Sequence, residues 1–271
     1  MWDSIFVLIR VVALVYVGLL LVLAGCQRGM IYYPTRAGES DAMAMAATDG
    51  LEPWRNGDGE IIGWRSSRPT DDADALLLFH GNAGFAAHRG YLVRGFEPDF
   101  AVYLFEYPGY GARSGKPSEK TFYAAGEEAL DQLMEERSGR VFLGGESLGS
   151  GVATHLAGAH SDRVSGLFLI TPFSSLVDVA RSHYPIFPVR WLMRDRYESA
   201  KHLETYGGPI AVLLAGRDEV VPARFGQKLY DGYDGPKQIW IQEDRSHNTL
   251  DYSPTRVWWS EVAEFLQTTA P

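Results

Sequence analysis

The 271-residue sequence has a single cysteine, Cys26, and no long run of basic residues. One cysteine cannot form an internal disulfide or supply a multi-thiolate metal site, which excludes a disulfide scaffold and a zinc finger. The formal net charge is −9, so a general nucleic-acid-binding protein is not expected. Hydrophobic residues make up 46% of the chain and charged residues 22%, which excludes a disordered chain and a polytopic membrane protein.

Uncharged, apolar residues are concentrated near the N-terminus. Val11 to Cys26 is a run of sixteen residues without a charge, and residues 5–9 extend the apolar stretch on the other side of an arginine. A helix over the combined stretch would be about 31 Å long, enough to cross the roughly 30 Å hydrocarbon core of a bilayer. We therefore predict a single-pass membrane anchor over residues 5–26.

Two alternatives to an anchor stay open. Residues 23–26 (LAGC) look like the lipobox of a bacterial lipoprotein signal, in which Cys26 would be lipidated. However, residues 1–9 include Asp3 and no lysine or arginine, whereas export signals usually begin with basic residues. Arg28 and Arg36 on the other flank leave the orientation undecided. The third possibility is a core helix of a soluble protein; the first two both predict association with a membrane.

After this segment, short apolar runs alternate with helix-like stretches, a pattern typical of βαβ units and a parallel sheet. Candidate strands lie at residues 61–65, 75–79, 101–106, 140–144, 164–170, 210–214 and 237–241, and candidate helices at 88–96, 118–137, 148–159, 222–230 and 254–267. Pro222 and Pro254 suit a first helical turn, and Ser253 is a good N-cap. We expect an α/β fold with a mostly parallel central sheet and helices on both faces.

The length and these patterns predict residues 1–30 as an N-terminal membrane or signal segment and residues 31–271 as one domain. Residues 172–208 break the alternation, because they are too long for an ordinary connection and rich in proline and aromatic residues. We expect one or two helices there, packed as a lid over the C-terminal edge of the sheet. Completion of the core is the alternative role for these aromatic residues.

The candidate nucleophile is Ser147, in the motif Gly145-Glu146-Ser147-Leu148-Gly149. A buried-strand pattern precedes the motif and a helix pattern with small residues follows it. A tight strand-to-helix turn strains the central serine and requires small flanking residues, which the glycines provide. The helix N-terminus would favour a developing negative charge.

A serine nucleophile needs a base and an orienting carboxylate. Asp218 follows the strand at 210–214, and His247 follows the strand at 237–241, so both are expected at the same edge of the sheet as Ser147. The order Ser147, Asp218, His247 is that of G-x-S-x-G hydrolases. Glu219, next to Asp218, is the rival acid.

The remaining requirement is a pair of donors for an oxyanion. We assign one to the backbone N–H of Leu148, directly after the nucleophile. The second is assigned to the backbone N–H of Asn82, in the glycine-rich loop after the strand at 75–79, with Ala83 as the alternative. This loop lacks the Gly-Lys-Ser/Thr of a nucleotide-binding loop. No metal or organic cofactor is expected.

Seven segments together resemble the α/β-hydrolase superfamily, and more narrowly its membrane-anchored single-domain serine hydrolases, which include protein depalmitoylases. They are Tyr32-Tyr33-Pro34, HGNAG at 80–84, EYPGYGARSG at 106–115, GESLGSG at 145–151, TPFSSLVDVA at 171–180, GRDEVVP at 216–222 and SHN at 246–248. The resemblance implies Ser147 as nucleophile, His247 as base and Asp218 as its orienter, and favours a transmembrane anchor. Ala215-Gly216 stands where His-Gly is commoner.

The sequence therefore predicts a membrane-attached serine hydrolase that cleaves ester or thioester bonds in acyl or lipid-like substrates. One alternative is a peptidase of the prolyl-aminopeptidase type, with Glu106, Glu146 and Asp178 as a site for the substrate's amino terminus. The other is a non-catalytic, membrane-tethered interaction module. The sequence does not indicate an oligomeric state.

Overall fold

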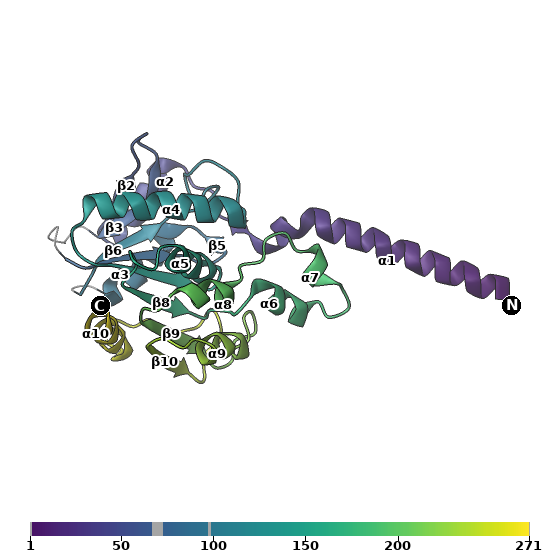
Figure 1. Cartoon of the computed structure of the whole chain (residues 1–271). Helices are drawn as coiled ribbons and strands as arrows, with labels where there is room; N and C mark the ends of the chain where they lie inside the picture. Colours follow the sequence, from purple (N-terminus) through teal and green to yellow (C-terminus); the bar gives the residue numbers. More distant parts are fainter. Residues whose placement is uncertain (1, 67–72, 97–98, 271) are drawn as a thin grey trace.

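The computed structural model describes residues 2–66, 73–96 and 99–270, and Figure 1 shows a long helix projecting from a domain built on a central sheet. Among these residues, eight strands form this sheet in the order β10-β9-β8-β7-β4-β6-β3-β2, parallel except for the pairs β2–β3 and β3–β6. The strands are β2 Leu51–Arg55, β3 Ile61–Ser66, β4 Ala75–Phe79, β6 Ala101–Phe105, β7 Val141–Glu146, β8 Gly166–Ile170, β9 Ile210–Ala215 and β10 Lys237–Gln242. The predicted mostly parallel sheet is confirmed.

Helices cover both faces of the sheet, as expected. They are α1 Trp2–Ile31, α2 Glu39–Thr48, α3 Gly90–Phe96, α4 Glu119–Glu136, α5 Leu148–Ala159, α6 Leu176–His183, α7 Val189–Leu192, α8 Ser199–His202, α9 Arg224–Asp231 and α10 Trp258–Thr269, with 3-10 turns at Ala86–Arg89 (η1) and Leu203–Thr205 (η2). The chain steps one way across the sheet from β4 to β6 and the other way from β6 to β7 and β8. Because such crossovers are right-handed, α3 lies on one face and α4 and α5 on the other.

The core lies along the middle of the sheet. Every residue of β4, β6, β8 and β9 is buried, as expected for parallel strands covered on both faces. This is why Ala75–Phe79 reads as an unbroken apolar run. At the edge of the sheet, no residue of β10 is fully buried.

Several predicted boundaries are wrong at their N-terminal ends. The last helix begins at Trp258 rather than Pro254, because Pro254 lies in a turn closed by the Arg256 amide on the Ser253 carbonyl (3.0 Å), so Ser253 is not its N-cap. Likewise α9 begins at Arg224, after a turn that starts at Pro222.

Two other predicted elements differ in extent. The predicted helix over 88–96 is a 3-10 turn followed by α3, and the predicted strand over 164–170 starts at Gly166. Sequence patterns did not predict α2, β2 or the two-stranded sheet of β1 (Tyr33–Pro34) and β5 (Ala83–Gly84).

Residues 172–208, called the insertion below, hold three short helices, α6, α7 and α8, and the turn η2, where one or two helices were expected. The whole insertion lies within the part of the chain that the structure describes. Figure 1 shows α6 and α7 at the end of the domain from which α1 projects, and α7 contacts α1. The first part of the insertion thus lies beside the long helix, whereas α8 and η2 pack against α5.

α1 is long and apolar enough to cross a membrane by length and composition, and its most apolar window is not buried in the protein. Its last turn leads directly into β1, which pairs with β5 in the loop after β4: Tyr33 N–H donates to the Asn82 carbonyl (2.9 Å) and Thr35 N–H to the Gly84 carbonyl (3.0 Å). The end of the long helix is therefore fixed to the loop in which an oxyanion donor is predicted.

Candidate active site

Ser147 lies at the turn between β7 and α5, with φ 51° and ψ −114°. A non-glycine residue rarely adopts this positive φ, so the serine is held in a strained conformation. The flanking glycines are required sterically. A Cβ on Gly145 would lie 2.5 Å from the Gly149 carbonyl oxygen, and one on Gly149 would overlap the Phe79 carbonyl. The predicted strand–turn–helix setting of the motif is confirmed.

The structure brings the three predicted side chains together. A 3.1 Å hydrogen bond joins His247 Nε2 to Ser147 Oγ, and a 2.7 Å hydrogen bond joins His247 Nδ1 to Asp218 Oδ2. The other carboxylate oxygen of Asp218 accepts from the backbone N–H groups of Val220 (2.9 Å) and Val221 (2.7 Å). Both oxygens of Asp218 are therefore engaged, and its side chain is almost fully buried. Glu219, the rival acid, instead lines the adjacent cavity.

These residues meet because β7, β9 and β10 are parallel and end at the same edge of the sheet. The loops after β9 and β10 are also joined by backbone hydrogen bonds, from Gly216 N–H to the Gln242 carbonyl (3.0 Å) and from Arg217 N–H to the Arg245 carbonyl (2.9 Å). A Cβ on Gly216 would lie 2.5 Å from the Glu243 carbonyl oxygen, so this close approach requires glycine. The glycine of the Ala215-Gly216 pair thus has a clear packing role.

Asn82 and Leu148 border the same cavity as Ser147. The Asn82 carbonyl accepts from the Tyr110 hydroxyl (2.7 Å), and its side-chain amide donates to the Ile31 carbonyl (2.8 Å). Leu148 is the first residue of α5, whose amide has no acceptor within the helix. Ala83, the alternative donor, lies in β5 and is not among the residues that border the cavity.

Sequence reasoning missed the role of Arg89, which lies on η1. Its Nε donates to Glu146 Oε2 (2.7 Å), and the same oxygen accepts from the backbone N–H of Gly81 (3.2 Å), while the Tyr91 hydroxyl donates to Oε1 (3.2 Å). Burial alone would raise the pKa of Glu146, but the Arg89 charge and these hydrogen bonds outweigh it and hold the pKa below its ordinary value. The residue before the nucleophile thus braces the loop of Asn82.

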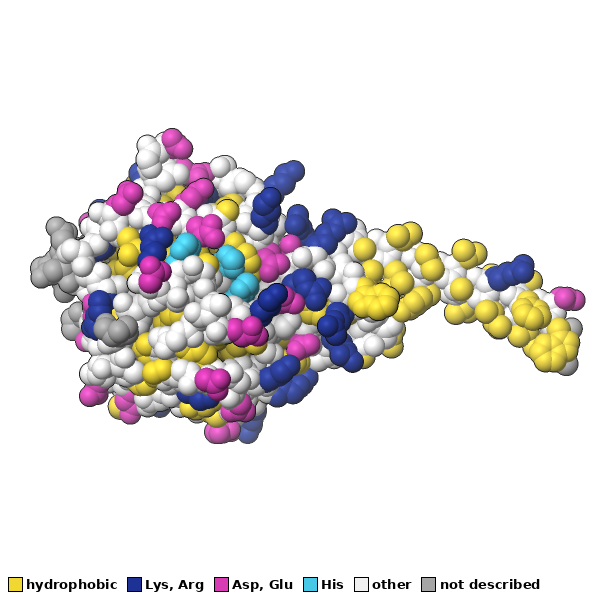
Figure 2. Space-filling view, in the orientation of Figure 1, with side chains coloured by type: hydrophobic (Ala, Val, Ile, Leu, Met, Phe, Trp, Pro, Cys, Tyr) yellow, Lys and Arg dark blue, Asp and Glu magenta, His cyan; other side chains and the backbone are white. Residues whose placement is uncertain are grey.

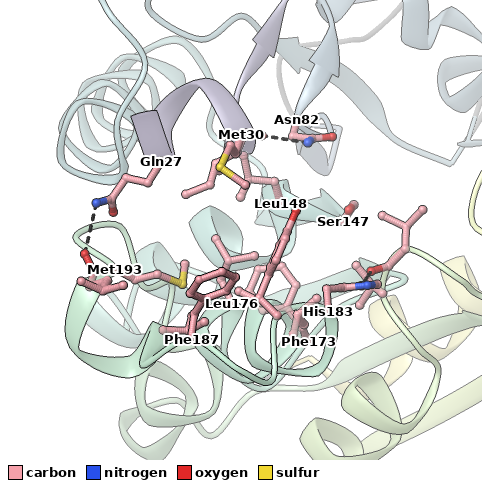
Figure 3. A pocket seen from close by; sticks show the side chains of 18 of the residues that line it. Gln27, Met30, Asn82, Ser147, Leu148, Phe173, Leu176, His183, Phe187 and Met193 are labelled. Atoms are coloured by element: carbon pink, nitrogen blue, oxygen red, sulfur yellow. Dashed lines mark hydrogen bonds between the residues drawn. The ribbon is translucent and has the colours of Figure 1, made fainter. Parts of the chain in front are cut away.

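A cavity of about 390 Å³ opens above Ser147 and is bordered mainly by apolar side chains (Figure 3). One wall comes from the insertion, including Phe173, Leu176 and Phe187. The opposite wall comes from the last turns of α1, including Leu23 and Met30. The long helix is therefore part of the site, which the sequence did not reveal because nothing in an apolar run indicates which side chains line a cavity.

Side chains of α1 and backbone groups of the insertion are joined directly. Gln27 donates to the Leu192 carbonyl (3.1 Å) and accepts from the Arg194 backbone N–H (2.7 Å). Further toward the N-terminus, the Tyr16 hydroxyl donates to the Ile186 carbonyl (2.9 Å), and the Tyr16 ring stacks on Phe187. The insertion therefore follows α1 along much of its length.

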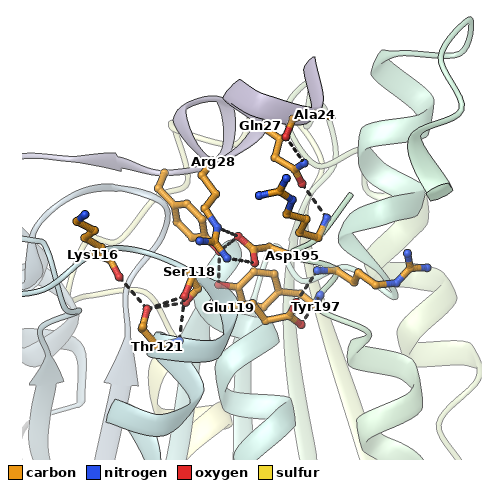
Figure 4. Close-up of polar contacts among 12 residues, drawn as sticks. Ala24, Gln27, Arg28, Lys116, Ser118, Glu119, Thr121, Asp195 and Tyr197 are labelled. Carbon is orange, nitrogen blue, oxygen red and sulfur yellow. Dashed lines mark hydrogen bonds and ion pairs between the residues drawn. The ribbon is translucent and has the colours of Figure 1, made fainter. Parts of the chain in front are cut away.

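An ion pair between the half-exposed Arg28 and the buried Asp195 fixes the base of this contact (Figure 4). The Arg28 guanidinium donates to both oxygens of Asp195 (2.9 and 3.2 Å), and the Tyr32 hydroxyl donates to Asp195 and contacts the Tyr197 hydroxyl (3.0 Å). Burial raises the pKa of Tyr32 and of Tyr197, so both remain neutral donors. Glu119 completes the network by accepting from the Tyr197 backbone N–H (2.8 Å).

The three carboxylates suggested for a peptidase are engaged elsewhere. Glu106 accepts from the Ala86 backbone N–H, Glu146 is paired with Arg89, and Asp178 lies 3.1 Å from Lys228 Nζ. None of the three borders the cavity, whose acidic member is Glu219. Across residues 2–66, 73–96 and 99–270, no cluster of three histidine, cysteine or acidic residues suits a metal ion.

Comparisons with known proteins agree on the fold and extend over most of the chain. A family model described as the alpha/beta hydrolase fold matches residues 74–264. An uncharacterised protein of Mycobacterium tuberculosis is 31% identical over 97% of this chain and 95% of that protein. The lysophosphatidylserine lipase ABHD12 of Danio rerio is 31% identical over 66% of this chain and 52% of the lipase, so this chain spans about half the length of that relative.

Solved structures are similar in fold. An esterase of Pyrococcus furiosus superposes with a TM-score of 0.63 at 16% identity, covering 88% of this chain and 97% of the esterase. A monoacylglycerol lipase of Paleococcus ferrophilus superposes with a TM-score of 0.57 at 19% identity, covering 77% of this chain and 99% of the lipase. The predicted fold class is confirmed.

Proposed function

The chain belongs to the α/β-hydrolase family, and from this premise we propose that it is a serine hydrolase that cleaves carboxylic ester or thioester bonds through an acyl-enzyme. The observation that carries the proposal is the continuous hydrogen-bonded series from Asp218 through His247 to Ser147 at a strained strand-to-helix turn. In this series Ser147 is the nucleophile, His247 the base and Asp218 the residue that orients the imidazole.

The proposed reaction has two halves. Ser147 Oγ attacks the substrate's carbonyl carbon while His247 Nε2 takes the hydroxyl proton. When the tetrahedral intermediate collapses, the C–O or C–S bond breaks, and His247 returns the proton to the leaving alcohol or thiol. Water then attacks the acyl-serine, with His247 again accepting a proton, and the carboxylic acid leaves as Ser147 regains its hydrogen.

We propose that the backbone N–H groups of Asn82 and Leu148 stabilise the oxyanion of each intermediate. Two features support this role: both residues border the cavity at Ser147, and the Asn82 loop is held in place on both sides. A correctly placed donor of this kind lowers the barrier by about 3–4 kcal/mol.

The substrate we propose is an acyl ester with a hydrocarbon chain, such as a lipid. The largely apolar cavity beside Ser147 supports this class over a polar substrate. The printed activity of the relative from Danio rerio, a lysophosphatidylserine lipase, is consistent with it. The peptidase alternative loses support, because the three carboxylates suggested for it are occupied by internal partners.

We further propose that α1 anchors the enzyme in a membrane through residues 5–26. The support is the length and apolar composition of the helix. Its N-terminal part projects away from the domain with its apolar side chains exposed (Figure 2). A lipoprotein processed at Cys26 is the alternative. That cleavage would remove Leu23 from the cavity wall and Tyr16 from its contact with the insertion.

The test is hydrolysis of p-nitrophenyl esters from acetate to palmitate by the full chain in detergent micelles. We expect the Ser147→Ala variant to lose up to about a millionfold in kcat, as when a triad serine is removed. Ser260→Ala is the matched control, because this serine lies on the exposed side of α10. A Ser147→Ala variant as active as the wild type would refute the mechanism.

Binding without catalysis is separated by covalent labelling. A fluorophosphonate probe should modify Ser147 in the wild type and leave the Ser147→Ala variant unlabelled, since it reacts with an activated serine. If neither ester hydrolysis nor labelling is observed, the interaction-module alternative is favoured instead.

A further inference from the structure

The contacts between α1 and the insertion restrict how the helix can sit in a bilayer. The tip of the insertion, residues 184–187, reaches Tyr16, in the middle of the apolar stretch: the Tyr16 hydroxyl donates to the Ile186 carbonyl (2.9 Å), and the Tyr16 ring stacks on Phe187. Ile31 lies fifteen positions after Tyr16, which is about 22 Å along the helix. The domain therefore contacts about half of α1.

The part of α1 beyond this contact is too short to cross the membrane alone. Residues 2–15 are all exposed, and among them Asp3 and Arg10 carry charges that favour the water interface. The twelve residues between Asp3 and Tyr16 extend about 18 Å, against a hydrocarbon core of roughly 30 Å. The missing length, about 12 Å, comes from the part of the helix that begins at Tyr16.

From this geometry we infer that the tip of the insertion is immersed in the same lipid leaflet as the part of α1 that it contacts. The partner is a lipid bilayer, and the inference rests on the membrane anchoring proposed above, not on hydrolysis. An acyl chain then has a route from the leaflet, along α1 past Leu23, into the cavity above Ser147, without crossing water.

The exposed side chains of residues 184–194 include apolar, aromatic and basic residues, the three types that a bilayer surface binds. Ile186, at the tip, is 73% exposed, and Trp191, on α7, is 87% exposed. An exposed tryptophan near the apolar tip suits the membrane–water interface, where amphipathic rings are enriched. Arg190 and Arg194 are exposed close to Trp191, and Figure 2 shows basic side chains gathered around the base of α1. These positive charges would lie at the depth of the lipid phosphates, which attract them.

The experiment measures depth with a single fluorescent label on the full chain. In a Cys26→Ser background, a cysteine is introduced by Ile186→Cys, labelled with an environment-sensitive dye, and reconstituted in phosphatidylcholine–phosphatidylglycerol vesicles. A nitroxide carried on the lipid acyl chains quenches dyes that lie in the hydrocarbon. We expect about twofold quenching at position 186, because the tip lies within the roughly 30 Å core.

Two reference positions make the result decisive. Val12→Cys reports whether α1 is inserted, and Glu135→Cys, exposed at the end of α4 far from α1, reports a site in water. Quenching at 186 and 12 but not at 135 supports the inference. A label at 186 that behaves like the one at 135 overturns it, and so does an unquenched label at 12, because α1 is then not in the bilayer.

The label at 186 is not in the cavity wall, so folding and depth are measured independently of catalysis. Circular dichroism of each labelled variant should match that of the wild type. Ester hydrolysis is assayed separately on the unlabelled wild type and Ser147→Ala. If the tip is quenched but no serine-dependent hydrolysis is seen, the proposed hydrolysis alone is refuted. If hydrolysis depends on Ser147 and position 12 is quenched but the tip is not, this inference alone is refuted.

Discussion

The side-chain amide of Asn82 donates a 2.8 Å hydrogen bond to the backbone carbonyl of Ile31, the last residue of α1. Two residues further on, Tyr33 N–H donates to the Asn82 carbonyl (2.9 Å). The proposed oxyanion donor is therefore held by the end of the proposed membrane anchor. The proposed donor at the cavity of Ser147 is thus positioned by a helix that the sequence predicts only as a membrane anchor.

Replacing the Asn82 side chain tests this dependence. Asn82→Ala keeps the backbone N–H but removes its bond to Ile31, and we expect kcat to fall about tenfold, a part of the value of an oxyanion donor. KM should change little, because the loss falls on the transition state. Asn56→Ala, in the β2–β3 turn, is the matched control. Equal kcat in Asn82→Ala and the wild type would contradict the role of this bond.

The ion pair between Arg28 and Asp195 should couple the anchor to the cavity. Arg28→Met leaves the buried Asp195 carboxylate with the Tyr32 hydroxyl alone. Because the arginine is half-exposed, we expect a loss of about 1–2 kcal/mol in unfolding free energy. Activity on long-chain esters should fall more than activity on acetate, since the cavity wall is loosened.

A double variant gives the control for this pair. Arg28→Met combined with Asp195→Asn removes both charges, so part of the lost stability should return. Arg55→Met, which breaks the exposed pair with Glu39, should leave the chain-length preference unchanged. If Arg55→Met and Arg28→Met shift that preference equally, the coupling is not specific.

The turn at Ser147 predicts a steric effect that does not depend on catalysis. A Cβ on Gly149 would overlap the carbonyl of Phe79, the last residue of β4, so the elbow cannot close against the sheet. We expect Gly149→Ala to lower the unfolding free energy by about 2–3 kcal/mol or more. Gly207→Ala is the comparison, because a Cβ there meets no atom within 4 Å. Denaturant unfolding of both variants measures the difference.

Two partly buried histidines should make stability depend on pH. Burial lowers the pKa of His155 and of His202, each to about 4, and the two rings pack edge to face beside Tyr123. Glu127 lies 3.5 Å from His155 but is exposed, so its attraction does not outweigh burial. Between about pH 6.5 and 4 the unfolded chain binds protons that the folded chain does not. The free energy of unfolding therefore decreases as the pH is lowered through that window.

Thermal unfolding checks this sign. We expect the Tm of the wild type to fall between pH 6.5 and 4 by about 2–4 °C more than that of His155→Gln, which cannot take up the proton. The difference should vanish above pH 7, where both histidines are neutral in either state. An identical decline in the two proteins would show that other groups cause it.

The sequence predicted the central strands of the sheet, which are covered by helices on both faces. Runs such as Ala75–Phe79 have one interpretation, a strand covered by helices, and these strands were correct within a few residues. Short elements were harder to predict. β1 and β5 have two residues each and exist because the end of α1 pairs with the loop of Asn82, a contact between segments far apart in the chain.

Motif spacing likewise predicted which side chains converge at Ser147, because parallel strands end at one edge. It did not predict the support around them. Arg89 lies 57 positions from Glu146, and Asp195 lies 167 positions from Arg28, so only the folded chain shows these pairs. The start of α10 was misplaced because Pro254 suits a turn as well as a helix.

The uninterrupted helix from Trp2 to Ile31 has a consequence for exchanging membrane segments between enzymes. Each residue added to an α-helix turns everything beyond it by about 100°. One residue inserted between Gln27 and Tyr32 would therefore rotate Gln27 away from Leu192 and turn a different side chain than Leu23 toward the cavity. A substitute helix of equal hydrophobicity but different rotational phase would keep the proposed membrane anchor, yet it would reshape the cavity of the proposed active site.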